Sequence, residues 1–403
     1  MFAEIKPSTP DPIMSLMEAY LQDRNPRKVN LGIGLYYDER GEVPLMRAVE
    51  LAEQRLLAQQ LPHGYPPIEG SVSFASQIQT LLLGPAAPEH ALATVQTVGG
   101  SGALKLAADF LVHFLQRKEI WVSDPTWANH QAIFSGAGLQ VNSYPYFDNL
   151  RGELRFADML ATLQTLPAGT AVLLHPCCHN PTGTDLSHSQ WQTLLGLVQA
   201  QGLLPFFDIA YQGFGAGLEE DCYALRLALE SDLDFIVANS FSKNIALYGQ
   251  RVGGLTVRCA NAQTAANVQG ALKTLIRRSY SCPPTHGSRI VDMVLADAQL
   301  RQLWQEELAA MRQRIQQMRL RLSAGLEQGG SQLDYRRIRD QRGMFSYTGL
   351  DERQVSELRQ RYAIYLVAPG RMCLPGLNGD NIDYVTAAIL DVTTAARVML
   401  PTY

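Results

Sequence analysis

The clearest sign of the architecture is the sequence Phe235-Ile236-Val237-Ala238-Asn239-Ser240-Phe241-Ser242-Lys243, in which a short apolar run leads directly into a polar loop. From about residue 91 to residue 257, similar runs alternate with helical segments, at Glu119–Ser123, Ala171–His175 and Leu203–Asp208. This alternation predicts an α/β fold with a mostly parallel sheet covered by helices. Ligands of such sheets bind beyond the carboxyl ends of the strands, so the residues after each run are candidate site residues.

The composition limits the possible classes of protein. The chain has 403 residues, 46% of them hydrophobic, which favours two domains over a single core. Its formal charge of −4 gives no reason to expect a nucleic acid or an anionic membrane as a partner. No apolar run approaches the roughly 20 residues that span a bilayer, and no export signal is visible at the start. Six cysteines in so long a chain favour reduced thiols and a cytoplasmic location.

Two features organise the rest of the chain. Pro7, Pro10 and Pro12 favour an extended N-terminal arm over residues 1–12. Apolar residues spaced three and four apart predict a long amphipathic helix that ends near Gly329, at Trp304, Leu308, Met311, Ile315, Met318 and Leu322. A helix that bridges two domains is favoured over a coiled coil, because the pattern covers too few heptads. The last hundred residues suggest a separate α+β unit.

Lys243 is the first candidate for chemistry. A lysine near a strand end is usually a solvated turn residue, but a sheltered amine there can bond covalently to a carbonyl group. Its neighbours favour the second interpretation, because Ser240-Phe241-Ser242-Lys243 is followed by Arg251-Val252-Gly253-Gly254.

These two segments resemble the cofactor-lysine region of the class I aminotransferases, specifically the aspartate and aromatic amino acid aminotransferase group. The resemblance extends from Val29-Asn30-Leu31-Gly32 to Gly370-Arg371-Met372. It implies a fold-type I transferase that binds pyridoxal 5'-phosphate, with a mostly parallel seven-stranded sheet in the large domain and a smaller α+β domain. The implied boundaries are residues 44–310 for the large domain, and 13–43 with 311–403 for the small domain. The family forms homodimers with composite active sites.

The resemblance assigns the polar residues around the cofactor ring. Asp208, in Phe206-Phe207-Asp208-Ile209-Ala210-Tyr211, matches the aspartate that keeps the pyridine nitrogen protonated, a role that suits a buried carboxylate. By the family pattern His175 supports this aspartate, and His130 lies behind the same side of the ring. Tyr211 and Asn180 match the residues that bond to the phenolic oxygen. Trp127 matches the residue that stacks on the ring.

The phosphate needs backbone donors at the start of a helix and a forked cation. The loop Val98-Gly99-Gly100-Ser101-Gly102 precedes a helical run, and Ser101 could cap that helix. Arg251 supplies the fork. The predicted phosphate ligands are Gly100, Ser101, Gly102, Ser240, Ser242 and Arg251, joined by Tyr65 from the other subunit.

A metal site is the alternative interpretation of one segment, because His175, Cys177, Cys178 and His179 are all competent ligands. The usual two-residue ligand spacing is absent, and adjacent residues of an extended chain point to opposite faces. We therefore predict no metal and expect these residues to pack around the site.

The substrate contacts also follow from the resemblance. Arg371 matches the arginine that binds the α-carboxylate in a bidentate manner, and Gly34 matches a further substrate contact. Trp127 and Asn180 belong to both the cofactor and the substrate set. Arg277, in Ile276-Arg277-Arg278-Ser279-Tyr280, matches the arginine that reaches in from the other subunit to the second carboxylate of aspartate or glutamate.

The segment that carries Leu35, Tyr37 and Val43, which we call the early loop, distinguishes between substrates. Leu35, Tyr37 and Val43, with Ser101, resemble the aromatic branch of the group, and would give an apolar lining suited to a phenyl or phenol ring. Gly64 and Cys282 depart from the family pattern and leave the substrate ranking open.

The sequence therefore predicts ping-pong transamination between tyrosine, phenylalanine or aspartate and 2-oxoglutarate, by way of pyridoxamine phosphate. Lys243, Asp208 and Tyr211 are the predicted catalytic residues. Two alternatives within the fold remain, an enzyme that prefers aspartate with weak aromatic activity and a pyridoxal enzyme of another reaction type. A regulatory protein built on an aminotransferase-like domain would need a DNA-binding extension, and the short N-terminus argues against one.

Overall fold

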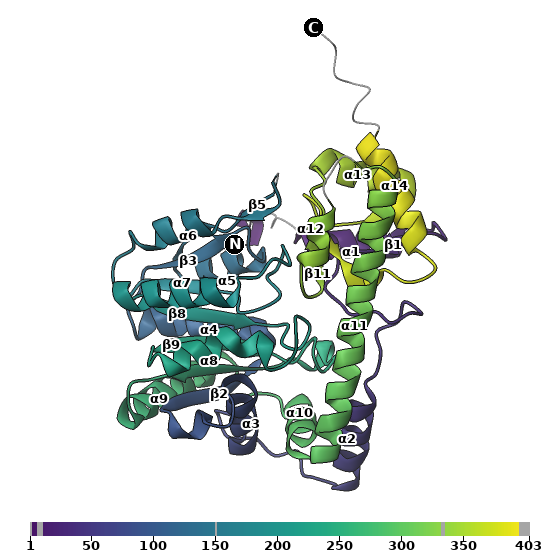
Figure 1. Cartoon of the computed structure of the whole chain (residues 1–403). Helices are drawn as coiled ribbons and strands as arrows, with labels where there is room; N and C mark the ends of the chain where they lie inside the picture. Colours follow the sequence, from purple (N-terminus) through teal and green to yellow (C-terminus); the bar gives the residue numbers. More distant parts are fainter. Residues whose placement is uncertain (1, 6–10, 150, 332–334, 395–403) are drawn as a thin grey trace. The chain divides into compact units, whose positions relative to one another are not determined.

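The apolar runs of the sequence form neighbouring strands of one seven-stranded sheet (Figure 1), in the order β2-β10-β9-β8-β7-β3-β4. The strands are β2 (Leu92–Val98), β3 (Glu119–Asp124), β4 (Gln140–Pro145), β7 (Ala171–Leu174), β8 (Leu204–Ile209), β9 (Phe235–Ser240) and β10 (Val252–Arg258). Strands β4, β3, β7, β8 and β9 pair in parallel, whereas β10 is antiparallel to both β2 and β9. The predicted mostly parallel sheet of seven strands is confirmed.

The computed structural model describes residues 2–5, 11–149, 151–331 and 335–394. The chain divides into two units, one made of Met1–Val43 with Arg314–Tyr403 and the other of Pro44–Gln313. Half of the predicted N-terminal arm, residues 1 and 6–10, lies outside the described ranges. Within them, Phe2–Glu4 form a 3-10 turn, and the Asp11 carboxylate caps a helix that begins at Pro12. Proline suits the first position of a helix, where its missing N–H has no partner to lose.

Helices cover the sheet of the larger unit, and local sequence explains where several of them begin and end. The Ser187 hydroxyl and the Gln190 side chain form a reciprocal capping box at the start of α7, and Gly202 ends that helix in the left-handed region. Ser71 and Asn261 cap two further helices. The helices are α2 (Arg47–Ala58), α3 (Val72–Leu83), α4 (Gly99–His113), α5 (Asn129–Ser135), α6 (Phe156–Leu163), α7 (His188–Gln201), α8 (Tyr223–Glu230), α9 (Ala262–Ser279) and α10 (His286–Ala296), with a small hairpin of β5 (Phe147–Asp148) and β6 (Glu153–Leu154).

The predicted long amphipathic helix is confirmed as α11 (Ala298–Gln328). All six apolar positions that predicted it are buried, and the Trp304 indole N–H donates to the carbonyl oxygen of Asn244 at 2.7 Å. The division between the two units falls within this helix, between Gln313 and Arg314. None of the helices in the described part of the chain combines the length and the apolar character needed to cross a membrane.

The smaller unit has mixed α+β structure, as predicted. Two short sheets form it, a parallel pair of β1 (Val29–Asn30) with β12 (Ile364–Tyr365) and an antiparallel pair of β11 (Phe345–Tyr347) with β13 (Arg371–Cys373). Its helices are α1 (Pro12–Gln22), α12 (Arg336–Asp340), α13 (Glu352–Tyr362) and α14 (Ile382–Thr394), with the second part of α11. The pairing of β1 with β12 joins the two ends of the sequence within this unit.

The central strand β8 gives a test of the core. Phe206 is fully buried there, and we expect Phe206→Ala to destabilise the protein by about 3–5 kcal/mol, because the substitution removes buried apolar surface and leaves a cavity. Urea denaturation followed by circular dichroism measures the change. Gln192→Ala, at an exposed position of α7, is the control and should shift the midpoint by far less. Equal midpoints for the two variants would contradict the assignment of Phe206 to the core.

Candidate active site

An ionised carboxylate lies at the carboxyl end of β8. Burial by itself would raise the pKa of Asp208, but a hydrogen bond from His130, the neighbouring imidazoles and the Lys243 amine hold that pKa below its usual value. His130 Nε2 lies 3.1 Å from Asp208 Oδ2, and His130 Nδ1 lies 2.8 Å from the Thr126 hydroxyl. With Asp208 ionised, Nε2 is the donor and Nδ1 accepts from Thr126. The site therefore keeps a negative charge in a sheltered position.

His175, which follows β7, lies beside this pair. Its Nδ1 accepts a hydrogen bond from the backbone N–H of Asn180 at 3.3 Å, which places the proton on Nε2. That Nε2 atom is buried and makes no hydrogen bond in the structure. It belongs to a group in which the ligand atoms of His130, His175 and Asp208 lie within 4.8 Å of one another. Burial lowers the pKa of His175 to about 4, so the imidazole is neutral at pH 7.

The segment after β7 is a folded loop, and here one premise of the sequence analysis is wrong. Strand β7 ends at Leu174, and Cys178 has a φ of 52°, so residues 175–179 are not extended. The Asp185 carboxylate closes the loop by accepting the backbone N–H groups of Cys178 and His179, both at 2.8 Å. As a result, both thiols lie on one side, with their sulfurs within 4.8 Å of an Asp221 carboxylate oxygen.

Asp221 already has backbone partners. It accepts the N–H groups of Gly213, Gly215 and Ala216 at 2.8–2.9 Å, and so fixes the loop that follows Tyr211. These bonds give the Asp221 carboxylate a structural role in that loop.

The start of α4 offers backbone donors for an anion. The helix begins at Gly99, and its N-cap residue, Val98, provides no side-chain hydrogen bond, so the first N–H groups have no cap. Ser101 was expected to cap this helix, but it lies within the first turn and is not the N-cap. The helix start is therefore an uncapped set of donors of the kind that binds phosphate.

A cation lies directly over this helix start. Gly99 has a φ of 67°, which favours glycine, and a Cβ atom added there would lie 2.7 Å from Arg251 Nη2, so a side chain at this position would displace the guanidinium. Arg251 Nη1 donates to the Ser242 hydroxyl at 3.3 Å and to the carbonyl oxygen of Tyr248 at 3.0 Å, and the Ser240 and Ser242 hydroxyls lie 3.1 Å apart. Arg251 precedes β10, which is antiparallel, so it lies at the edge where β9 and β8 end. We call Gly99–Gly102, Ser240, Ser242 and Arg251 the anion cradle.

The remaining predicted residues of the larger unit extend from the same edge. Lys243 Nζ lies 5.0 Å from the centre of the Tyr211 ring. The side chains of Tyr211 and Asn180 are buried. The Trp127 ring packs edge-on against His130, with the ring centres 5.2 Å apart. The structure thus gathers Lys243, Asp208 and Tyr211 at the ends of neighbouring strands.

In the smaller unit, Arg371 is buried and fixed. Its Nη2 donates to the carbonyl oxygen of Gly32 at 2.6 Å, and its guanidinium lies 4.5 Å from the centre of the Phe345 ring. A Cβ atom on Gly34 would lie 3.0 Å from the tip of the same Phe345 ring. Arg371 and the backbone near Gly34 are therefore parts of one packed cluster.

Two predicted residues point away from the core of their own unit. The Tyr65 side chain is 96% exposed, which is unusual for so large an aromatic residue. Arg277 is exposed at the end of α9 and bonds to the Ser281 hydroxyl. Both positions leave the side chain available to another chain.

Several polar partners of the site were missed by the sequence analysis. Thr126 orients His130, while Ser123 and Thr182 hold the two ring nitrogens of His179 at 2.9 and 2.8 Å. The His179 ring also stacks on Tyr146, with ring centres 4.0 Å apart. Nothing in the spacing of these residues predicts the contacts, because serine and threonine at strand ends are common in turns.

A lysine, an ionised carboxylate and an anion cradle at one edge of a parallel sheet are typical of α/β transferases that hold a phosphorylated cofactor. The family model for aminotransferase class I and II matches residues 26–389, and the chain belongs to this family.

Individual proteins with similar sequences are aromatic and aspartate aminotransferases; the aspartate aminotransferase of Escherichia coli (strain K12), for example, is 42% identical over 395 residues, which are 97% of this chain and 100% of the relative. The chain is 49% identical over 398 residues to the aromatic-amino-acid aminotransferase of Escherichia coli (strain K12), which covers 97% of this chain and 100% of the relative. The crystal structure of an aromatic-amino-acid aminotransferase from Burkholderia pseudomallei, covalently bound to pyridoxal phosphate, superposes with a TM-score of 0.95 at 45% identity, over 98% of this chain and 99% of that one. An aromatic amino acid aminotransferase from Psychrobacter sp. B6, cocrystallised with aspartic acid, gives a TM-score of 0.95 at 46% identity, over 97% and 99%.

The buried imidazole of His175 should make stability depend on pH. In the unfolded chain His175 takes a proton below about pH 6.5, but in the folded chain it does so only near pH 4. Between these values the unfolded state binds more protons, so this residue's contribution to stability falls as the pH falls, by on the order of 3 kcal/mol in total.

We therefore expect His175→Gln to flatten the pH dependence of the free energy of unfolding between pH 6.5 and 4. Urea titrations at several pH values measure it. His113→Gln, at an exposed position at the end of α4, is the matched control, because it removes an imidazole without touching the buried cluster. A His175→Gln variant with the unaltered slope would contradict the neutral, buried imidazole.

Proposed function

We propose that this chain is a pyridoxal 5'-phosphate-dependent aminotransferase that acts on tyrosine, phenylalanine and aspartate, with 2-oxoglutarate as the amino acceptor. One observation carries the proposal, namely that the larger unit brings Lys243, the ionised Asp208 and the anion cradle to one edge of the sheet. The similarity to aromatic aminotransferases over nearly the whole chain supports the reaction.

The residues present fit the cofactor. The Arg251 guanidinium, the two serine hydroxyls and the uncapped start of α4 suit a phosphate group, and the glycine at position 99 leaves room for the arginine. Asp208 suits a protonated pyridine nitrogen, because its carboxylate stays charged despite burial. When bound, pyridoxal phosphate withdraws electrons from the substrate's α-carbon and makes its proton acidic.

Each residue then has a distinct task. Asp208 holds the proton on the ring nitrogen, and His130 and Thr126 keep that carboxylate oriented. Tyr211 and Asn180 donate to the phenolic oxygen, and Trp127 supplies an apolar face to the ring. Lys243 Nζ would take the proton from the substrate's α-carbon and later give a proton to the cofactor, so that one amine would act first as base and then as acid.

An arginine of the smaller unit is the proposed partner of the substrate's α-carboxylate. We propose that Arg371 binds the α-carboxylate with a bidentate pair, near the contact expected for Gly34. Its bond to Gly32 and its packing on Phe345 fix the guanidinium before substrate arrives. A fixed fork orients the bond that must break, which is a large part of the catalytic effect.

The range of amino acids follows from two further features. Arg277 is proposed to meet the second carboxylate of aspartate or glutamate, whereas Leu35, Tyr37 and Val43 supply apolar surface for an aromatic ring. An aromatic enzyme cocrystallised with aspartic acid supports this dual range. The second candidate is an enzyme that prefers aspartate, which the same Arg277 would favour.

The amino-acid half-reaction tests the proposal directly. Purified protein loaded with pyridoxal phosphate should change its visible absorbance when tyrosine, phenylalanine or aspartate is added. Lys243→Ala should slow this change by about 10²–10⁴-fold, because it removes the base. Lys105→Ala, on the exposed face of α4, is the control and should react like the wild type. A wild type that responds to none of these amino acids, or a Lys243→Ala variant with normal turnover, would refute the assignment.

We also propose a homodimer with composite active sites. The nearly complete exposure of Tyr65 supports it, as does the 84% exposure of Val72 on the same part of the larger unit. Tyr65 would reach the phosphate of the second subunit, and Arg277 would reach its substrate. Five of the six free thiols are buried, a form that a reducing compartment preserves, and we propose the cytoplasm as the location.

Subunit mixing tests the composite site. Lys243→Ala and Arg277→Ala should each turn aspartate over poorly as separate proteins. When the two are co-expressed, half of the dimers are hybrids with one intact site of two, so aspartate turnover should recover to roughly a quarter of the wild type. Absence of any recovery in purified hybrids would show that Arg277 acts within its own subunit, and full activity of Arg277→Ala by itself would show that Arg277 has no role in binding aspartate.

A further inference from the structure

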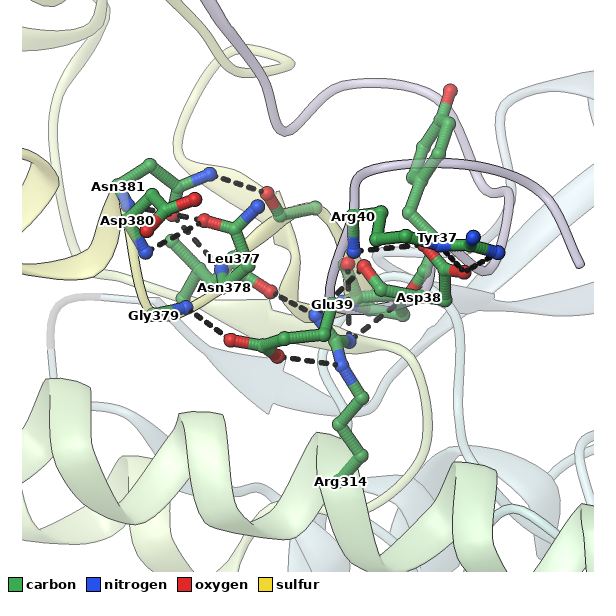
Figure 2. A network of polar contacts seen from close by, with 12 residues as sticks. Tyr37, Asp38, Glu39, Arg40, Arg314, Leu377, Asn378, Gly379, Asp380 and Asn381 are labelled. Atoms are coloured by element: carbon green, nitrogen blue, oxygen red, sulfur yellow. Dashed lines mark hydrogen bonds and ion pairs between the residues drawn. The ribbon is translucent and has the colours of Figure 1, made fainter.

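Arg314 uses every donor of its guanidinium to hold main-chain carbonyl groups and one carboxylate (Figure 2). Nη1 donates to the carbonyl oxygens of Tyr37 at 2.9 Å and Pro375 at 3.4 Å, and Nη2 to those of Asp38 at 3.1 Å and Leu377 at 2.6 Å. Nε donates to Glu39 Oε2 at 3.2 Å. Its side chain is only 13% exposed. A planar fork with five donors is the one side chain that can make this set of contacts.

Glu39 completes the contact on the other side. While Oε2 accepts from Arg314, Oε1 accepts the backbone N–H of Gly379 at 2.5 Å, so one carboxylate joins the early loop to the turn before α14. Asn381 holds that turn by donating to the carbonyl oxygen of Gly376 at 2.9 Å. Figure 2 shows the two loops meeting at the Arg314 guanidinium. We call Arg314 with Glu39 the loop clamp.

Other hydrogen bonds fix the early loop on both sides of the residues that Arg314 holds. After them, Asp38 Oδ1 accepts the N–H groups of Arg40 and Glu42 and so forms a tight turn over residues 38–42. At the other end, Arg371 donates to the carbonyl oxygen of Gly32, and the Cys373 sulfur lies 3.6 Å from the carbonyl oxygen of Leu35. The main chain of residues 32–39 is thus held at both ends within the smaller unit, and Leu35 and Tyr37 lie between the fixed points.

We propose that Arg314 is a positioning residue that sets the amino-acid selectivity, by holding the main chain of Tyr37 and Asp38 so that Leu35 and Tyr37 present a fixed apolar surface. This inference rests on the proposed function, in which these side chains meet the substrate's aromatic ring. An aromatic ring gains its binding energy from close apolar contact, which is lost when the lining moves. The carboxylates of aspartate bind through arginine ion pairs that do not need this lining.

The test compares two substrates in one variant. Arg314→Lys keeps the charge but has at most three donors on one atom, so it cannot make all five of these contacts. We expect the ratio of kcat/KM for phenylalanine to kcat/KM for aspartate to fall about tenfold, chiefly through a higher KM for phenylalanine. Arg321→Lys is the matched control, since Arg321 lies on the same helix with a single exposed ion pair to Asp383, and its ratio should equal that of the wild type.

Glu39→Gln provides an independent variant. Glu39 is 58% exposed, so this variant should fold, and it keeps one acceptor oxygen while losing the charge. We expect its ratio to fall about two- to threefold, and this variant decides the question if Arg314→Lys does not fold. Thermal melting of each variant separates a loss of stability from a change in selectivity.

The possible outcomes are distinct. A lower ratio in both clamp variants supports the positioning role. An unchanged ratio in a folded Arg314→Lys protein, or equal losses with both substrates, overturns it and leaves the proposed function standing. A wild-type protein that turns over neither substrate overturns the proposed function together with the inference.

Discussion

Keeping the Asp208 carboxylate charged in a buried position is the constraint on which the site of the larger unit depends. Burial opposes that charge, and only specific donors can offset the loss of water. His130 follows β3, His175 follows β7 and Asp208 lies in β8, and these three strands are neighbours in the sheet. Because their carboxyl ends meet at one edge, residues about 80 positions apart in the sequence form one buried polar cluster.

The same edge also explains the anion cradle. Strand β10 runs against its neighbours, so its beginning lies beside the ends of β2 and β9, and Arg251 meets the start of α4 and the serines after β9. The close approach requires glycine, since a Cβ atom on Gly253 would lie 2.6 Å from the carbonyl oxygen of Asn239 and 2.7 Å from the backbone of Gly99. A positive site thus forms near the negative Asp208, with Lys243 on the loop between β9 and β10.

The sequence predicted the sheet because its strands are short, continuous apolar runs, and it predicted α11 because its apolar positions repeat with the helical period. Polar contacts between residues far apart in the sequence could not be predicted in this way. Arg314 occupies a polar position in the α11 pattern, and nothing local shows that it bonds to Tyr37, 277 residues earlier. Thr126 and Ser123 were missed for the same reason. The extended interpretation of residues 175–179 was wrong because Asp185 and the left-handed Cys178 fold that segment into a loop.

The loop clamp acts almost entirely on the backbone. Four of the five acceptors that Arg314 contacts are main-chain carbonyl oxygens, which every amino acid carries. The side chains at positions 35 and 37 can therefore change while Arg314 keeps these hydrogen bonds. In a loop fixed in this way, the main-chain conformation does not depend on the side chains that face the substrate. Descendants of one ancestral chain could therefore acquire new substrate preferences by single substitutions in the early loop, while the scaffold that presents those residues stayed the same.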